Sequence, residues 1–101
     1  MARGDSTKLA DRNRKKLREP ENYRVILLND NYTTMDFVVE ILISIFQKKI
    51  EEANRIMLDV HRKGQGLVGL YPWDIAQTRT EQVHAEAAKK GFPLRCIVEQ
   101  A

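Results

Sequence analysis

The chain has 101 residues, and a hydrophobic content of 43% allows one modest core and a single domain. No apolar run approaches the roughly 20 residues of a membrane-spanning helix, and the hydrophilic N-terminus lacks the apolar segment of a secretory signal. The single cysteine, Cys96, excludes an internal disulfide and fits a reducing compartment. We therefore expect a cytoplasmic protein with no membrane association.

The net charge of +3 falls on residues 1–22, which hold seven basic and four acidic side chains, whereas residues 23–101 hold ten of each. Residues 1–22 have few apolar positions and no useful periodicity, so we predict a flexible basic extension ahead of one folded domain over 23–101. A domain without net positive charge offers no footprint for phosphates, so no nucleic acid is expected as a partner. The alternative is a small nucleic-acid or ribosome-associated module that contacts RNA through the basic extension.

The folded part opens with an apolar strand, 23–28, which runs into a polar corner, 29–34. A strongly apolar helix follows over about 35–47, and Thr33 lies three residues before Asp36, as in a capping box. Its polar residues occupy one narrow sector, so apolar positions remain to cover a second helix or to line a pocket.

The second predicted helix, about 50–63, ends at Gly64 and has an apolar stripe at Ile50, Ala53, Met57 and Val60, with His61 in the same stripe. A second strand spans 65–71. A third helix spans about 73–90, with small residues suited to packing on a sheet, and a last strand spans 94–99. The order predicts an α+β two-layer domain, in which helices cover a three-stranded, mainly antiparallel sheet.

Three features could form a site: Asn29 with Asp30 in the corner, the face of Met57, Val60 and His61, and the apolar Met35 and Val38. Each also has an ordinary explanation, because Asn and Asp form turns, a lone histidine is often a satisfied core residue, and methionine fills cores. Together they indicate a recognition pocket with a polar rim and an apolar base.

Catalysis and metal binding are poorly supported. In a hydrolase, Asp30 could orient His61 as a general base. However, the only serines are Ser6 and Ser44, and Cys96 lies in a strand, so no nucleophile presents itself. Two histidines and one cysteine without ligand spacing do not make a metal site. We expect a non-enzymatic protein without a cofactor.

The run from Tyr23 to Val38 resembles the opening of the ClpS family, bacterial adaptors of the N-end rule pathway that hand substrates to the Clp AAA+ unfoldase and protease. The resemblance continues through 57–61, Gly64, Gly69, 76–79 and 93–96, and it covers roughly residues 22–101. It implies an adaptor for substrates that begin with Leu, Phe, Tyr or Trp. It also implies a monomer that docks on the N-terminal domain of a ClpA-type unfoldase.

The resemblance also implies roles for particular residues. Three groups would bind the free α-amino group of the substrate: Asn29, Asp30 and His61. Five side chains would enclose its first side chain: Met35, Val38, Met57, Val60 and Leu94. Asn31 and Thr33 would form the rim, and the unfoldase would dock near Asp74, Thr78 and Arg79.

Two features depart from the family. Asn31 stands where many members have a second aspartate, which suggests an altered affinity or side-chain preference. The strong basic character of residues 1–22 is not something the family predicts, although the family's N-terminal extension is needed for delivery.

Overall fold

Six elements follow one another in the predicted order. They are β1 (Asn22–Leu28), α2 (Met35–Ser44), α3 (Ile50–Lys63), β2 (Gln65–Pro72), α4 (Trp73–Lys90) and β3 (Arg95–Gln100). The computed structural model describes residues 22–101, so the predicted basic extension lies outside the described residues except for Asn22. The α+β class and the order β-α-α-β-α-β are confirmed.

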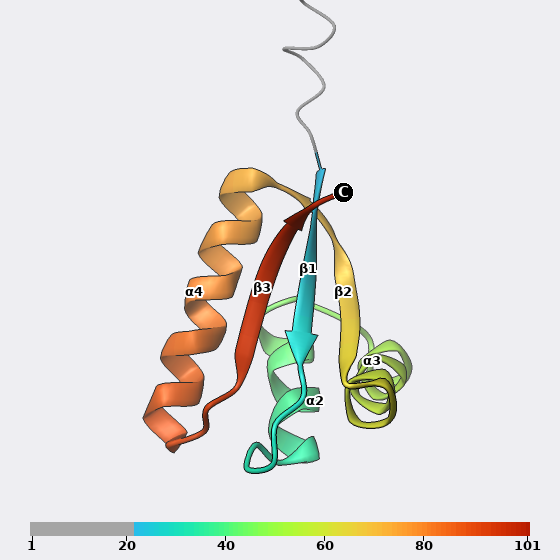
Figure 1. Ribbon diagram of the computed structural model, residues 1–101, viewed down its shortest axis with the longest axis vertical. Coiled ribbons are helices and arrows are strands. Elements are labelled where there is room, and N and C mark those ends of the chain that lie inside the picture. The colour runs from blue at the N-terminus through green and yellow to red at the C-terminus, as the bar shows by residue number, and fades with distance from the viewer. Residues whose placement is uncertain (1–21) are drawn as a thin grey trace, which may run out of the picture.

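β1 is the central strand of an antiparallel sheet with the order β2-β1-β3 (Figure 1). Val25 and Leu27 are fully buried against the helices, whereas Ile26 between them lies outside the main core cluster, as the alternation of a strand requires. The register between β1 and β2 shifts at Val25/Ile26, where β2 contributes one extra residue, Val68.

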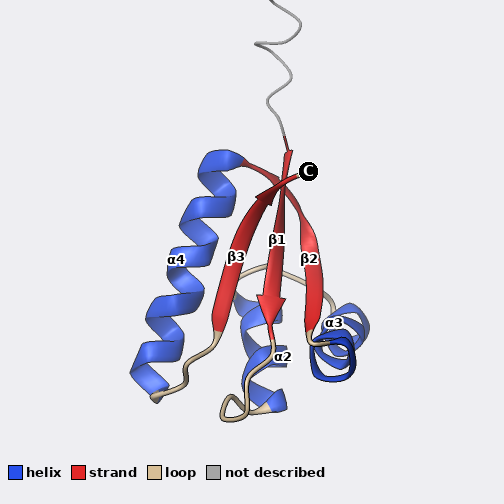
Figure 2. Cartoon of the chain, viewed as in Figure 1, coloured by secondary structure: helices blue, strands red, loops and turns tan. Residues whose placement is uncertain are grey.

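All three helices supply buried side chains to one apolar cluster with the sheet. The cluster holds Val25, Leu27, Phe37, Val38, Ile41, Leu42, Phe46, Ala53, Ile56, Val60, Val68, Ala76, Val83, Ala87, Leu94 and Cys96. Figure 2 shows that the loop after β1 and the C-terminal end of α3 lie at the same end of the sheet. That shared end brings the polar corner next to α3. Within residues 22–101, no helix has both the length and the apolar character to cross a bilayer.

The start and the end of α2 differ from the prediction. The N-cap is Thr34, whose hydroxyl accepts a hydrogen bond from the Phe37 N–H at 3.1 Å, so the predicted capping box of Thr33 and Asp36 is wrong. The helix ends at Ser44 and not near Gln47. Gln47 takes a left-handed φ of 53°, and the next N–H, that of Lys48, bonds back to the Leu42 carbonyl. No glycine marks this turn, so the apolar pattern of the sequence predicted a helix that extends beyond Ser44.

The buried face of α3 is turned slightly from the predicted stripe. Ala53, Ile56 and Val60 are buried, and they follow the spacing of one helix face. Ile50 is 50% exposed, so its predicted place in the stripe is wrong, and Ile56 was missed. The rotation leaves Met57 and His61 at the edge of the core and not within it. α3 ends at Gly64, which has a φ of 89°, as predicted.

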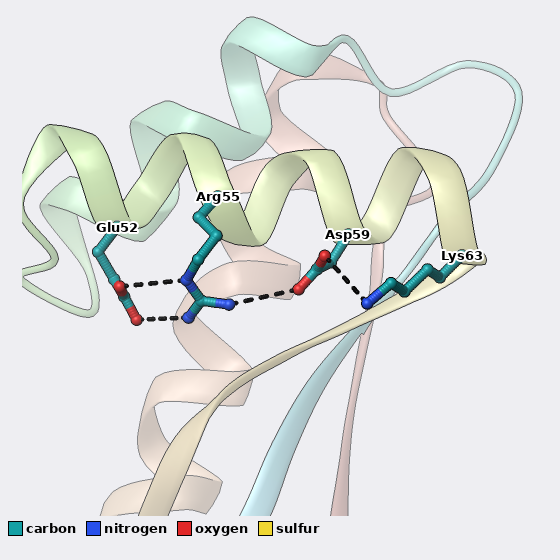
Figure 3. Close-up of polar contacts among 4 residues, drawn as sticks. All are labelled: Glu52, Arg55, Asp59 and Lys63. Carbon is teal, nitrogen blue, oxygen red and sulfur yellow. Dashed lines mark hydrogen bonds and ion pairs between the residues drawn. The ribbon is translucent and has the colours of Figure 1, made fainter.

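The outer face of α3 carries a ladder of charges (Figure 3). Arg55 pairs with Glu52 at 2.6 Å and with Asp59 at 3.4 Å, and Lys63 pairs with Asp59 at 3.5 Å. The hydrogen bond between Arg55 and Glu52 lowers the pKa of the Glu52 carboxyl and raises the pKa of the Arg55 guanidinium. These spacings of three and four residues support the helix on its solvent side, so its other side is left for the core and for the pocket described next.

Candidate functional site

A pocket of about 350 Å³ lies between the polar corner and α3. The corner and the start of α2 form one wall, and the last turns of α3 form the other. Its lining consists of Asn29, Asp30, Asn31, Thr33, Thr34, Met35, Val38, Met57, Val60 and His61. The structure therefore brings together nearly all of the residues that the sequence suggested for a recognition pocket.

Asp30 is fixed by three hydrogen bonds from the corner itself. Its Oδ1 accepts from the backbone N–H of Tyr32 at 2.8 Å and of Thr33 at 2.7 Å, and its Oδ2 accepts from the Thr33 hydroxyl at 2.7 Å. Burial raises the pKa of this carboxyl, but the bonds from Thr33 and Tyr32 together outweigh burial and lower it. Asp30 is thus an ionised acceptor held in one orientation.

The carboxylate still has room for one more donor. A carboxylate offers about four lone-pair sites, and the corner uses two on Oδ1 and one on Oδ2. The remaining acceptor position is on Oδ2. Asp30 can therefore bond to a ligand without giving up the contacts that orient it.

A backbone hydrogen bond joins the two walls of the pocket. The Asn29 N–H donates to the Gly64 carbonyl at 3.0 Å, which ties the end of β1 to the residue that ends α3. His61, three residues before Gly64, is exposed and lines the pocket from the α3 side. Its imidazole and the Asp30 carboxylate consequently border the same hollow.

The base of the pocket is apolar. Val38 is 4% exposed and Val60 is 3% exposed, whereas Met57 is half-buried and Met35 is 46% exposed. Two rigid branched side chains thus form the floor, and two flexible thioether side chains stand nearer to solvent. Leu94 is buried in the core and is not among the lining residues.

A larger hollow of about 780 Å³ lies between α2 and α4. Three of its lining residues are the predicted docking residues Asp74, Thr78 and Arg79. The Arg79 guanidinium lies 5.5 Å from the ring centre of Tyr71, which holds it at this surface. The other lining residues are Glu40, Ser44, Ile45, Gln47, Ile75, Gln82 and Glu86.

The smaller pocket has the better chemistry for a small ligand, although the larger hollow has more volume. It combines an oriented carboxylate with a buried apolar floor, while mostly polar side chains line the α2–α4 hollow. Sequence reasoning missed Thr34 in the pocket and the α2 side of the hollow. The spacing of Thr34 to Phe37 could have indicated the cap, but nothing in the sequence indicates that α2 and α4 share a hollow.

The described residues offer binding groups but no catalytic set. Burial raises the pKa of the Cys96 thiol to about 11, with a small opposing effect of the Thr80 hydrogen bond. Ser44 lines the other hollow. Within residues 22–101 no three His, Cys, Asp or Glu side chains gather as a metal site would require. Fold and site together define a small α+β binding domain with a polar-rimmed apolar pocket.

Comparison with known proteins extends this assignment. The family model of the ATP-dependent Clp protease adaptor protein ClpS matches residues 18–97. The ATP-dependent Clp protease adapter protein ClpS of Syntrophus aciditrophicus is 59% identical over 85 residues, which is 84% of this chain and 79% of that protein. The ClpS adapter of Acetivibrio thermocellus is 57% identical over 82 residues, covering 81% of this chain and 83% of the relative.

A solved structure shows the same fold. The structure of Agrobacterium tumefaciens ClpS2 bound to L-phenylalaninamide superposes with a TM-score of 0.79 at 34% sequence identity, covering 82% of this chain and 100% of that chain. This chain belongs to the ClpS family. It is an adaptor of a Clp protease and not an enzyme, as its resemblance to the family implied.

Proposed function

We propose that this adaptor binds proteins that begin with a bulky hydrophobic residue (Leu, Phe, Tyr or Trp) through their free α-amino group and delivers them to a ClpA-type unfoldase for degradation. The observation that carries the proposal is the pocket itself, in which Asn29, Asp30 and His61 border a hollow floored by Val38 and Val60. Such a pocket suits a ligand with a cation at one end and an apolar group at the other.

An α-ammonium group has three N–H donors, and the mouth of the pocket offers three acceptors. They are the open position on Asp30, the side-chain oxygen of Asn29, and an unprotonated nitrogen of His61. Along a polypeptide backbone, only the first residue carries such an ammonium group, because every later backbone nitrogen is an amide with at most one N–H. Asn31 and Thr33 form the rim, and Met35 and Met57 adapt to the side chain that enters. Leu94 belongs to the same apolar cluster as the floor residues Val38 and Val60 but does not line the pocket.

The ligand of the ClpS2 structure supports this chemistry. L-phenylalaninamide carries a free α-amino group next to a bulky apolar side chain. Those are the two features that the pocket of this chain is suited to receive.

The decisive experiment compares two peptides that differ only at the α-amino group. A labelled peptide beginning with Phe should bind in fluorescence anisotropy, and its N-acetylated form should bind at least about tenfold more weakly, because acetylation removes the charge and two donors. Asp30→Ala should weaken binding of the free peptide by about 1.5 to 3 kcal/mol and leave the acetylated peptide nearly unaffected. Equal affinity for both peptides would reject the proposed site.

Delivery requires a second contact, which we assign to Asp74, Thr78 and Arg79 in the α2–α4 hollow. Arg79→Ala should weaken association with the N-terminal domain of a ClpA-type unfoldase in a pull-down while leaving peptide binding intact. Lys90→Ala, which also removes a basic side chain from α4 but lies outside the hollow, is the matched control. Equal pull-down by both variants would place the docking surface elsewhere.

The competing module that binds RNA through a basic extension receives no support from the described residues, because residues 23–101 carry ten basic and ten acidic side chains. The cytoplasmic location and the monomeric state of the protein stay predictions.

A further inference from the structure

Gly66, the second residue of β2, touches α3 more closely than a side chain would permit. A Cβ atom at this position would lie 2.8 Å from the Cγ2 of Val60, 2.9 Å from the carbonyl oxygen of Ile56 and 3.3 Å from the backbone nitrogen of Val60. Gly66 is not among the residues with a positive φ, so its backbone conformation does not require glycine. What requires glycine here is the close approach of strand and helix.

Two of the three atoms belong to the backbone of α3, so a side-chain rotation cannot remove the overlap. Ile56 is 0% exposed and Val60 is 3% exposed, which leaves the surrounding core little room to yield. Any larger residue at position 66 must therefore push this turn of α3 away from β2.

The turn in question carries the α3 wall of the pocket. Met57, Val60 and His61 all line the pocket and lie on or next to the turn that Gly66 contacts. Gly66 also pairs with Leu27 in β1, and β1 leads after one further residue to Asn29 and Asp30 in the opposite wall. Gly66 thus contacts the α3 wall directly and is joined through β1 to the opposite wall.

We propose that Gly66 is a positioning residue for the pocket, whose missing side chain sets how far the imidazole of His61 lies from the carboxylate of Asp30. This inference rests on the proposed function of the pocket. Two contacts fix the two walls relative to each other, and the first is the hydrogen bond between Asn29 and Gly64. The second is the contact between Gly66 and α3. A ligand that must reach both walls at once depends on both contacts.

The same strand supplies a matched control. At Gly69 the three atoms nearest to an added Cβ all belong to the Tyr71 side chain, the closest at 3.1 Å, and Gly69 lies outside the pocket lining. Gly66→Ala and Gly69→Ala therefore add the same methyl group to the same strand, but only the first presses on the pocket wall.

The test measures binding of the free and the N-acetylated Phe peptide to wild type, Gly66→Ala and Gly69→Ala, together with thermal unfolding by circular dichroism. Gly66→Ala should still unfold cooperatively but bind the free peptide about tenfold or more weakly, because a displacement of about 1 Å disrupts a preorganised site. Gly69→Ala should bind within about twofold of wild type. A folded Gly66→Ala protein with unchanged affinity would overturn the inference.

A double-mutant cycle separates positioning from general loss of structure. Val60→Ala removes one of the atoms that the new Cβ would meet, so Gly66→Ala should weaken peptide binding less in that background than in wild type. If Gly66→Ala alone does not fold, the double variant is compared with Val60→Ala alone; it should bind the free peptide more weakly, because the overlap with the Ile56 carbonyl remains, and equal affinity would overturn the inference. Additive effects in the cycle would overturn the inference. Failure of wild type to distinguish the two peptides would instead reject the proposed function itself.

Discussion

Thr33 holds Asp30 through both its backbone and its side chain. Its N–H donates to Oδ1 and its hydroxyl to Oδ2, each at 2.7 Å. The carboxylate is thereby oriented before any ligand arrives, and these bonds leave one acceptor position on Oδ2 unused. Preorganisation of this kind reduces the entropy that binding must overcome.

The neighbouring threonines should respond differently to the same change. Thr33→Val removes a hydrogen bond to Asp30 and should weaken peptide binding by about 1 kcal/mol. Thr34→Val removes the N-cap of α2 and should instead lower the free energy of unfolding by about 1 kcal/mol. Peptide titration and urea unfolding of both variants check this division. A binding defect confined to Thr34→Val would contradict it.

The two histidines should also separate stability from binding. The Cys96 N–H, on β3, donates to Nε2 of His84 at 3.0 Å, so His84→Ala should lower the free energy of unfolding by about 1 kcal/mol. His61 is exposed, so His61→Ala should change stability by less than about 0.5 kcal/mol while greatly weakening peptide binding. Equal loss of affinity in both variants would argue against a binding role for His61.

Acid should remove the contribution of Asp30 to stability. Its pKa in the folded state lies below the ordinary value of 3.8, so the stabilisation is present above that pH and is lost as the pH falls through the lowered value. We expect Asp30→Asn to be less stable than wild type at neutral pH and the difference to shrink in acid. Urea unfolding at a series of pH values measures this, and a constant difference would show that the carboxylate charge is not involved.

Cys96 should resist alkylation in the folded protein. A pKa raised from 9.0 to about 11 reduces the thiolate fraction at pH 8 about a hundredfold, and burial also restricts access. Iodoacetamide should modify the thiol in urea but hardly at all in buffer, as followed by mass spectrometry. Thr80→Val should react no faster than wild type, since the Thr80 hydrogen bond lowers the pKa. Rapid labelling of the native protein would contradict the buried position.

Asn31→Asp should strengthen binding of free peptides. Asn31 is exposed at the rim, so a new carboxylate there would attract the substrate ammonium through solvent, by about two- to fivefold in affinity. The gain should disappear at high salt, because screening is strong for exposed charges. Anisotropy titrations at low and high salt test this, and the N-acetylated peptide should show no gain.

The sequence by itself determined the order of the elements and most of the residues that line the pocket, although not Thr34. The ends of α3 and α4 follow from Gly64 and Gly91, whose left-handed conformations terminate helices locally. The corner after β1 is likewise a local feature, because Asn and Asp bond to their own backbone. Signals of this kind act over a few residues and can be read from spacing alone.

Only the tertiary structure decided which faces and walls meet. The rotation that buries Ile56 and leaves Ile50 exposed depends on where α3 packs against β2, and so does the position of Met57 and His61 at the pocket edge. The end of α2 at Ser44 and the hollow between α2 and α4 have no local signal. The hollow arises from the packing of segments far apart in the chain, which local propensity does not encode.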